Sequence, residues 1–111
     1  MSRRVFVPLQ SAPFGRFLRG SKSVEVRDAK SPVAQSVLLA KPGTPVLLRR
    51  GYSTADELHG RLGQVWRADR LDLLPTEVLE LADLRDLSTS AFFDAQRPVV
   101  AFHVVLVDEE V

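Results

Sequence analysis

Within the first eighteen residues, the spacing of apolar positions changes from the alternation typical of a strand to the spacing typical of a helix. Residues 5–9 read Val-Phe-Val-Pro-Leu, and the alternation of aliphatic residues with Phe and Pro predicts a short strand with one buried face. Phe14, Phe17 and Leu18 then recur at the spacing of one helix face, and Ser11 is a suitable N-cap for that helix. The pattern therefore predicts a strand followed by a short helix.

Apolar segments farther along the chain predict more strands, with helices before the last one. In order, they are strands at 45–50 and about 60–71, helices at 73–87 and 88–95, and a Val-rich strand at 98–107. The last strand is a nearly continuous apolar run, so it is expected to be covered on both faces. Residues 28–36 are polar and contain Pro32, so they are expected to form a loop, as are residues 51–56.

One predicted strand contains an internal glycine. Leu62, Trp66 and Ala68 are expected to form the inner face of the strand at about 60–71, with Gly63 marking a bulge. A chain of 111 residues is long enough for one core. The sequence thus predicts a single domain over residues 1–111 that mixes strands and helices.

Composition excludes several classes of chemistry. The chain has no cysteine, so it forms no disulfide and offers no thiolate ligand, and its two histidines, His59 and His103, are not at a metal-binding spacing. No Gly-rich nucleotide fingerprint or serine nucleophile elbow is present. We therefore expect no metal and no cofactor. The apolar stretch after the initial Met-Ser-Arg-Arg is too short for a signal peptide or membrane helix, which predicts a soluble cytoplasmic protein without a membrane partner.

Charge is distributed unevenly along the chain, although the formal net charge is only +1. Residues 1–70 contain 13 Lys and Arg against 5 Asp and Glu, whereas residues 71–111 contain 2 against 9. The first part therefore carries +8 and the second −7. This asymmetry predicts one basic face and one acidic face, and the alternative is that it reflects only solvated surface.

The most informative segment is Gly-Ser-Lys-Ser-Val-Glu-Val-Arg at residues 20–27. Side chains alternate faces along a strand, so the two valines are expected to enter the core while Ser23, Glu25 and Arg27 line the other face. Lys22 precedes the strand. One interpretation is that these charges only pair on an exposed strand face, which would contribute ~0–1 kcal/mol.

The four fixed positions Gly20, Lys22, Glu25 and Arg27 form the pattern Gly-x-Lys-x-x-Glu-x-Arg, which resembles the signature of the ASCH domain. ASCH domains are a PUA-like family associated with RNA, and a first strand and short helix precede the motif in that family as they do here. The resemblance implies an α+β fold, a small PUA-like mixed β-barrel with flanking short helices. It also implies that RNA or a nucleoside or nucleotide is the ligand, with the two cations contacting phosphate or carbonyl oxygens and Glu25 orienting them.

A second candidate set follows the strand at 45–50. Arg49, Arg50 and Tyr52 lie at its end, beside Gly51, and an aromatic residue next to arginine is typical of single-stranded nucleic acid sites. Adjacent strand residues point to opposite faces, so at most one of the two arginines can face the same cleft as the motif. The alternative is a solvated loop in which Tyr52 covers the end of the barrel.

Three other functions remain open from the sequence. Some ASCH proteins are amidohydrolases of N4-acetylcytidine that use a lysine, a threonine and a glutamate; Lys22 matches the lysine, but Glu25 stands where the threonine would be. In a hydrolase of this kind Lys22 would act as the base, assisted by Glu25 or Ser23. A ribonuclease is a second alternative, for which the resemblance supplies no residue set. A protein-interaction module that uses the acidic C-terminal third is the remaining one.

Overall fold

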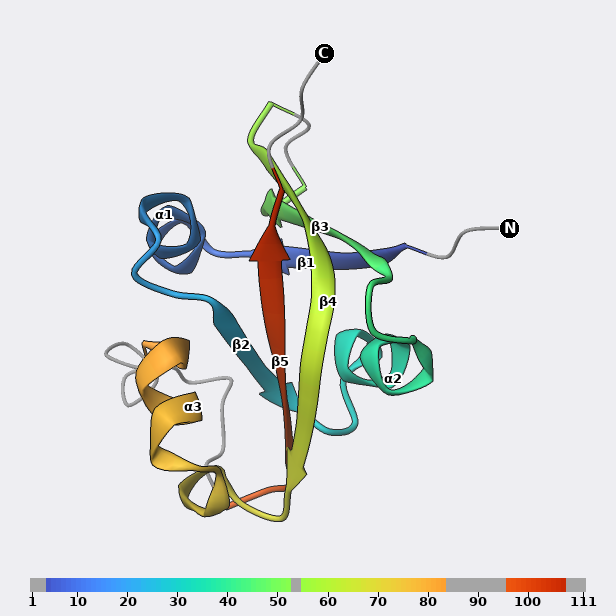
Figure 1. The fold of residues 1–111 in the computed structure, drawn as a ribbon, viewed down its shortest axis with the longest axis vertical. Coiled ribbons are helices and arrows are strands. Elements are labelled where there is room, and N and C mark those ends of the chain that lie inside the picture. Colours follow the sequence, from blue (N-terminus) through green and yellow to red (C-terminus); the bar gives the residue numbers. More distant parts are fainter. Residues whose placement is uncertain (1–3, 53–54, 84–95, 108–111) are drawn as a thin grey trace.

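The computed structural model describes residues 4–52, 55–83 and 96–107. A five-stranded sheet curls into a half-barrel with three short helices around it (Figure 1). In chain order the elements are β1 (Val5–Leu9), α1 (Ser11–Arg19), β2 (Val24–Asp28), α2 (Pro32–Leu39), β3 (Pro45–Arg50), β4 (Glu57–Ala68), a 3-10 turn (Leu71–Leu73), α3 (Thr76–Ala82) and β5 (Val99–Leu106). The α+β fold class expected from the sequence is confirmed.

The strand order is β1-β3-β4-β5-β2, so β1 and β2 are the two edges of the sheet. β1 runs parallel to β3, whereas the β3–β4, β4–β5 and β5–β2 pairs are antiparallel. The two strands that come first in the sequence therefore lie at opposite edges, and they form no backbone ladder with each other. The gap between these edges is called the seam below.

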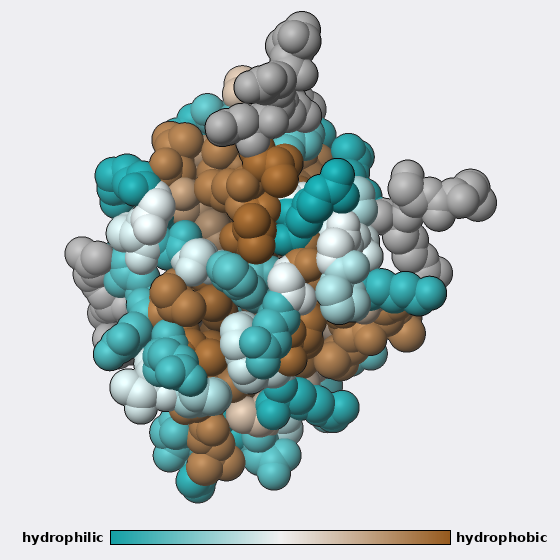
Figure 2. All heavy atoms as spheres, in the orientation of Figure 1, coloured by the Kyte–Doolittle hydropathy of each residue, from teal (hydrophilic) through white to brown (hydrophobic). Residues whose placement is uncertain are grey.

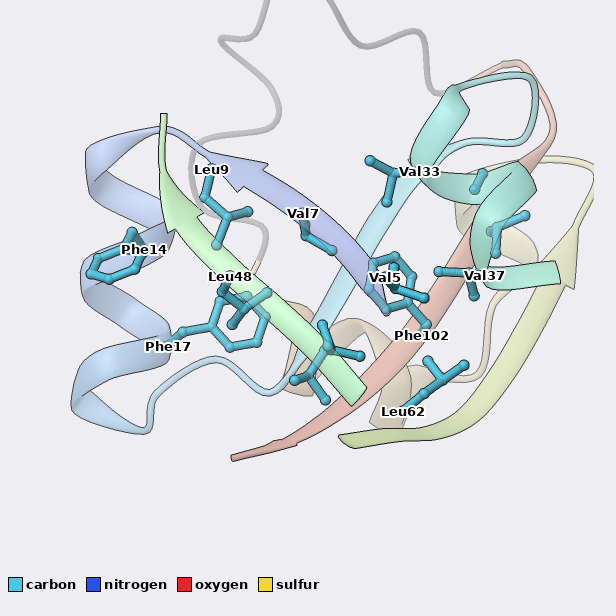
Figure 3. Close-up of a cluster of buried hydrophobic side chains, with 14 of the residues drawn as sticks. Val5, Val7, Leu9, Phe14, Phe17, Val33, Val37, Leu48, Leu62 and Phe102 are labelled. Atoms are coloured by element: carbon cyan, nitrogen blue, oxygen red, sulfur yellow. The ribbon is translucent and has the colours of Figure 1, made fainter. Parts of the chain in front are cut away.

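The main hydrophobic core lies on the concave side of the sheet, between the sheet and helices α1 and α2. Phe14 and Phe17 project from α1 and Val33 and Val37 from α2 towards buried residues of the strands, among them Phe102 (Figure 3). Phe17 and Phe102 are fully buried, and burial of one such side chain contributes about 1.5–3 kcal/mol. Hydrophobic packing against two helices thus holds the edges of the sheet near each other.

A second, smaller core lies under α3 on the other side of β2 and β5. Val24 and Val26 of β2 pack there with Val78 and Ala82 of α3 and with Ala101 of β5. Because β5 contributes to both cores, its segment 99–104 is apolar and covered on both faces, except for partly exposed His103, as the sequence predicted. Val105, Leu106 and Val107 are exposed, so the prediction of a strand covered on both faces was wrong for the C-terminal end of 98–107. On the surface, hydrophobic residues lie among hydrophilic ones (Figure 2).

The prediction of a loop over residues 28–36 was wrong, because α2 begins at Pro32. Ser31 is the N-cap, and its hydroxyl accepts a hydrogen bond from the backbone N–H of Ala34 at 3.2 Å. Proline at the first helical position lacks only an N–H that would have no partner within the helix. Val33 and Val37 then bury one helix face. Pro32 starts a helix here instead of preventing one.

The glycine bulge in β4 was predicted, but its effect on the strand faces was not. Leu62 pairs with Val104 and Val65 pairs with Phe102, so the register shifts between these pairs. The extra residue reverses which side later side chains face. Leu62 consequently packs in the main core, whereas Trp66 and Ala68 pack against the second core. The expected single inner face of Leu62, Trp66 and Ala68 was therefore wrong.

The helix ends also refine the predictions. Gln10, not Ser11, is the N-cap of α1, and no side chain caps that end. Gly20 ends α1 in the left-handed conformation with φ 82°, which a residue without a side chain adopts readily. Of the helix predicted over 73–87, the structure has α3 at Thr76–Ala82, and residues beyond 83 lie outside the described residues. The helix predicted over 88–95 lies wholly outside them.

Candidate ligand site at the seam of the sheet

Glu25 is the centre of a charged cluster that the motif forms at the seam. Its Oε1 lies 3.3 Å from the Lys22 ammonium, and its Oε2 lies 3.0 Å from Nη2 of Arg27 and accepts a hydrogen bond from Nε at 3.1 Å. Glu25 and Lys22 are 7% and 5% exposed. The interpretation as an exposed strand face was therefore wrong for these two residues, because Glu25 points to the side of the sheet where its register partner Phe102 packs.

Arg27 connects the two edges of the sheet. Its side chain leaves β2, and Nη2 donates a hydrogen bond of 2.6 Å to the backbone carbonyl of Pro8 in β1. Charged donors make stronger hydrogen bonds than neutral ones, and guanidinium offers five donors in a rigid plane. The remaining guanidinium nitrogen, Nη1, makes no hydrogen bond with the described part of the chain, and the side chain is 24% exposed. Arg27 therefore closes the seam and still presents donors to solvent.

Lys22 attaches helix α3 to the motif. Its ammonium donates a hydrogen bond to the carbonyl of Ala82, the last residue of α3, and lies 5.6 Å from the centre of the Phe17 ring. A cation at a helix C-terminus is favourable because the helix dipole and the unpaired carbonyls are negative there. Buried charges are costly unless they are paired, and Lys22 is paired with both Glu25 and Ala82.

Two further contacts fix the same end of α3. The backbone N–H of Ser23 donates to the carbonyl of Leu81 at 2.9 Å, and Nε of Arg16 lies 3.7 Å from a carboxylate oxygen of Asp83. Ser23 thus contributes through its backbone. The sequence did not single out Arg16 or Asp83, and an arginine in an amphipathic helix carries no signal for an ion pair with a residue so distant in sequence.

A shallow groove of about 560 Å³ adjoins the seam. It is formed where β1 leads into α1 and where β3 ends, and its lining residues are Pro8, Leu9, Gln10, Ser11, Arg50 and Gly51. Pro8 belongs to both features, because it lines the groove and its carbonyl accepts the hydrogen bond from Arg27. Arg50 forms an exposed ion pair with Asp56 at the rim.

The structure separates the members of the second predicted set. Arg50 lines the groove, whereas Arg49 packs over the Phe6 ring, 5.3 Å from its centre, and pairs with Glu57 at 2.8 Å. Tyr52 also contacts Phe6, with ring centres 6.2 Å apart. Phe6 alternates with the core residues of β1 and so lies on the opposite face. Arg49 and Arg50 therefore lie on opposite faces, as adjacent strand residues do, and the expectation was that at most one of them faces the same cleft as the motif.

Within residues 4–52, 55–83 and 96–107, no three His, Cys, Asp or Glu residues are grouped so that they could hold a metal ion. None of the helices in these segments has the length and apolarity needed to cross a membrane.

Every buried side-chain nitrogen and oxygen of the described residues has a hydrogen-bond partner. The buried nitrogen and oxygen atoms of the charged cluster at the seam therefore all have hydrogen-bond partners within the protein.

No family model matches the sequence, and no curated protein matches it. Solved structures do. The ASCH protein of Zymomonas mobilis aligns with 95% of this chain and with 67% of its own chain, at 16% identity and a TM-score of 0.66. The ASCH domain of Lactobacillus crispatus JV V101 aligns with 91% of this chain and with 79% of its own chain, at 10% identity and a TM-score of 0.61. Hypothetical protein PH0355 matches 95% of this chain and all of its own, at 16% identity and TM-score 0.68.

The curled sheet and the three helices of the described residues define an α+β domain. Within that class, this chain has the ASCH fold, which confirms the resemblance inferred from the motif at the level of the fold. At sequence identities of 10–16%, the similarity to these structures shows the fold and nothing more.

Proposed function

We propose that this chain binds a nucleotide or single-stranded RNA in the groove beside the seam. Arg27 and Arg50 would contact phosphate or carbonyl oxygens there, while Lys22 and Glu25 hold Arg27 in position. The observation that carries the proposal is the charge of the motif cluster. Two cations, Lys22 and Arg27, share the single carboxylate of Glu25, and the partly exposed cation lies next to the groove.

An anionic ligand fits this arrangement for two reasons. The cluster carries one excess positive charge in a largely buried position, and an anion nearby would compensate it. The exposed pair between Arg50 and Asp56 costs little to open, because exposed ion pairs contribute ~0–1 kcal/mol. A phosphate can therefore replace Asp56 as the partner of Arg50, and Arg guanidinium matches the geometry of phosphate oxygens.

The hydrolase alternative uses the same residues but needs Lys22 to reach the substrate. In the structure its ammonium is held by the Ala82 carbonyl and by Glu25, and it is buried. A catalytic role would require the end of α3 to move away. No contact among the described residues favours this alternative or a ribonuclease. A protein-interaction module would use the acidic residues of 71–111, of which Asp72, Glu77, Glu80 and Asp83 lie within the described residues and five others lie outside them.

Fluorescence anisotropy with a labelled uridine oligonucleotide of about ten nucleotides tests the proposal. Arg50→Ala should weaken binding several-fold without loss of stability, because only an exposed ion pair is removed. Arg70→Ala is the matched control, since the Arg70 side chain is 47% exposed, against 50% for Arg50, and also pairs with an aspartate, Asp72 of the 3-10 turn. Equal affinity of the two variants would count against the groove, and absence of binding by the parent protein would count against the function.

A further inference from the structure

Tyr52 has an unusual setting on the face of β1 and β3 that lies opposite the main core. It is 81% exposed and follows Gly51, whose φ of 60° turns the chain out of β3. Its ring contacts the ring of Phe6, and the two ring planes are at an angle of 41°. Contact with Phe6 covers only a small part of the tyrosine, which leaves a large aromatic surface open to solvent. The patch formed by Phe6, Arg49 and Tyr52 is called the aromatic patch below.

Arg49 gives the aromatic patch a fixed guanidinium. Its Nε and Nη2 both bind Oε1 of Glu57, at 2.9 and 2.8 Å, and its Cζ lies over the Phe6 ring. Cation–π contact and a two-point ion pair hold the arginine against the sheet. Arg49 and the open ring of Tyr52 thus both contact Phe6. Exposed aromatic rings together with arginine are the residues on which unpaired bases stack in single-stranded nucleic acid sites.

The aromatic patch and the groove are neighbours. Arg50 and Gly51 line the groove, and Tyr52 follows them directly in the chain. The backbone N–H of Gly51 donates to the carbonyl of Leu9 at 2.7 Å, which ties this turn to the end of β1. A strand that occupies the groove next to Arg27 can therefore continue over the rim at Gly51 and reach the open ring of Tyr52.

We infer that the aromatic patch binds a second base, so that the ligand is single-stranded RNA and not a free nucleoside or mononucleotide. This inference rests on the proposed function, because the groove supplies the first nucleotide position. The groove, the seam and the aromatic patch together contain an excess of one positive charge: the cations are Lys22, Arg27, Arg49 and Arg50, and the carboxylates are Glu25, Asp56 and Glu57. That charge is complementary to a polyanion that contacts several of these residues at once.

The test compares two probes on three proteins: the labelled uridine oligonucleotide and, as a competitor, uridine monophosphate, on the parent chain, Tyr52→Ala and Tyr52→Phe. Tyr52→Ala should lower affinity for the oligonucleotide by about ten-fold, the usual loss for one stacked base. The inhibition constant of the mononucleotide should stay unchanged. Tyr52→Phe should retain most of the affinity, because it keeps the ring. The side chain is exposed, so both variants are expected to fold.

The possible failures are distinguishable. If the parent binds both probes and Arg50→Ala weakens both while Tyr52→Ala weakens neither, the second base position is wrong and the proposed function stands. Loss of mononucleotide binding in Tyr52→Ala would also overturn the inference, because it would place the tyrosine in the first position. If neither probe binds the parent chain, both the inference and the proposed function are wrong.

Discussion

Arg27, on one edge strand of the sheet, donates a 2.6 Å hydrogen bond to the backbone carbonyl of Pro8, on the other edge strand. The two residues lie 19 positions apart in sequence and belong to strands that do not pair. A residue of the motif thus bridges the open side of the half-barrel, at the point where the groove begins. Structure and candidate function depend on the same side chain.

Arg27→Ala should destabilise the fold, because it removes the bridge to Pro8 and one of the two cations on Glu25. We expect a loss of about 1.5–3 kcal/mol, the usual contribution of a hydrogen bond to a charged group. Urea unfolding followed by circular dichroism measures this. Arg70→Ala should change stability by less than about 0.5 kcal/mol. Equal stability of the two variants would show that the seam does not depend on Arg27.

Lys22→Met should loosen the end of α3. The variant keeps most of the side-chain volume but loses the ammonium that binds Ala82 and Glu25. Hydrogen exchange of the α3 amides should become faster relative to those of β5, which has its own ladders to β2 and β4. Unchanged protection of α3 would mean that its packing against Val24 and Val26, and not Lys22, fixes its position.

Two glycine substitutions should have opposite effects on stability. Gly60→Ala would place its Cβ 2.7 Å from Cγ1 of Val104 and 2.9 Å from the carbonyl oxygen of Val105, so it should cost about 1–3 kcal/mol. Gly15→Ala lies within α1, meets only the flexible end of Arg19 at 3.1 Å, and should stabilise by about 0.4–1 kcal/mol. Thermal unfolding of both variants measures the difference. A stabilised Gly60→Ala would contradict the β4–β5 register.

Deacetylation of N4-acetylcytidine should be absent or very slow. Acyl transfer needs an activated nucleophile or base at the substrate, and Lys22 is held by Glu25 and Ala82. Incubation of the protein with acetylated cytidine, followed by chromatography, tests this expectation. Turnover by the parent chain that disappears in Lys22→Ala would make the hydrolase alternative correct.

Local sequence signals predicted the parts of the fold that depend on local patterns. The alternation of apolar residues at 5–9 predicted β1, and the apolar run at 98–107 predicted β5. The helical spacing of apolar residues before Gly20 predicted α1. The pattern at residues 20–27 also indicated that Lys22, Glu25 and Arg27 act together, and they are in direct contact. Helix α2 was missed because a proline among polar residues usually marks a loop, whereas Ser31 caps a helix here.

The partners of the motif could not be predicted from sequence. Lys22 binds the carbonyl of a residue 60 positions away, and Arg27 binds the carbonyl of Pro8. Backbone acceptors exist at every residue, so they leave no trace in the sequence, and only the fold selects which of them meet a side chain. For the same reason the resemblance implied that Lys22 contacts phosphate or carbonyl oxygens of the ligand, whereas its ammonium is buried and the groove lies beside Arg27.

The most direct test of the proposed function is an NMR titration of the isotope-labelled chain with the uridine oligonucleotide. Binding in the groove predicts that the largest shifts occur at the backbone amides of Leu9, Gln10, Ser11 and Gly51 and at the side-chain Nε of Arg27, while the amides of α3 shift little. Shifts confined to α3 or to the exposed end of β5, or no shifts at saturating RNA, would contradict the account.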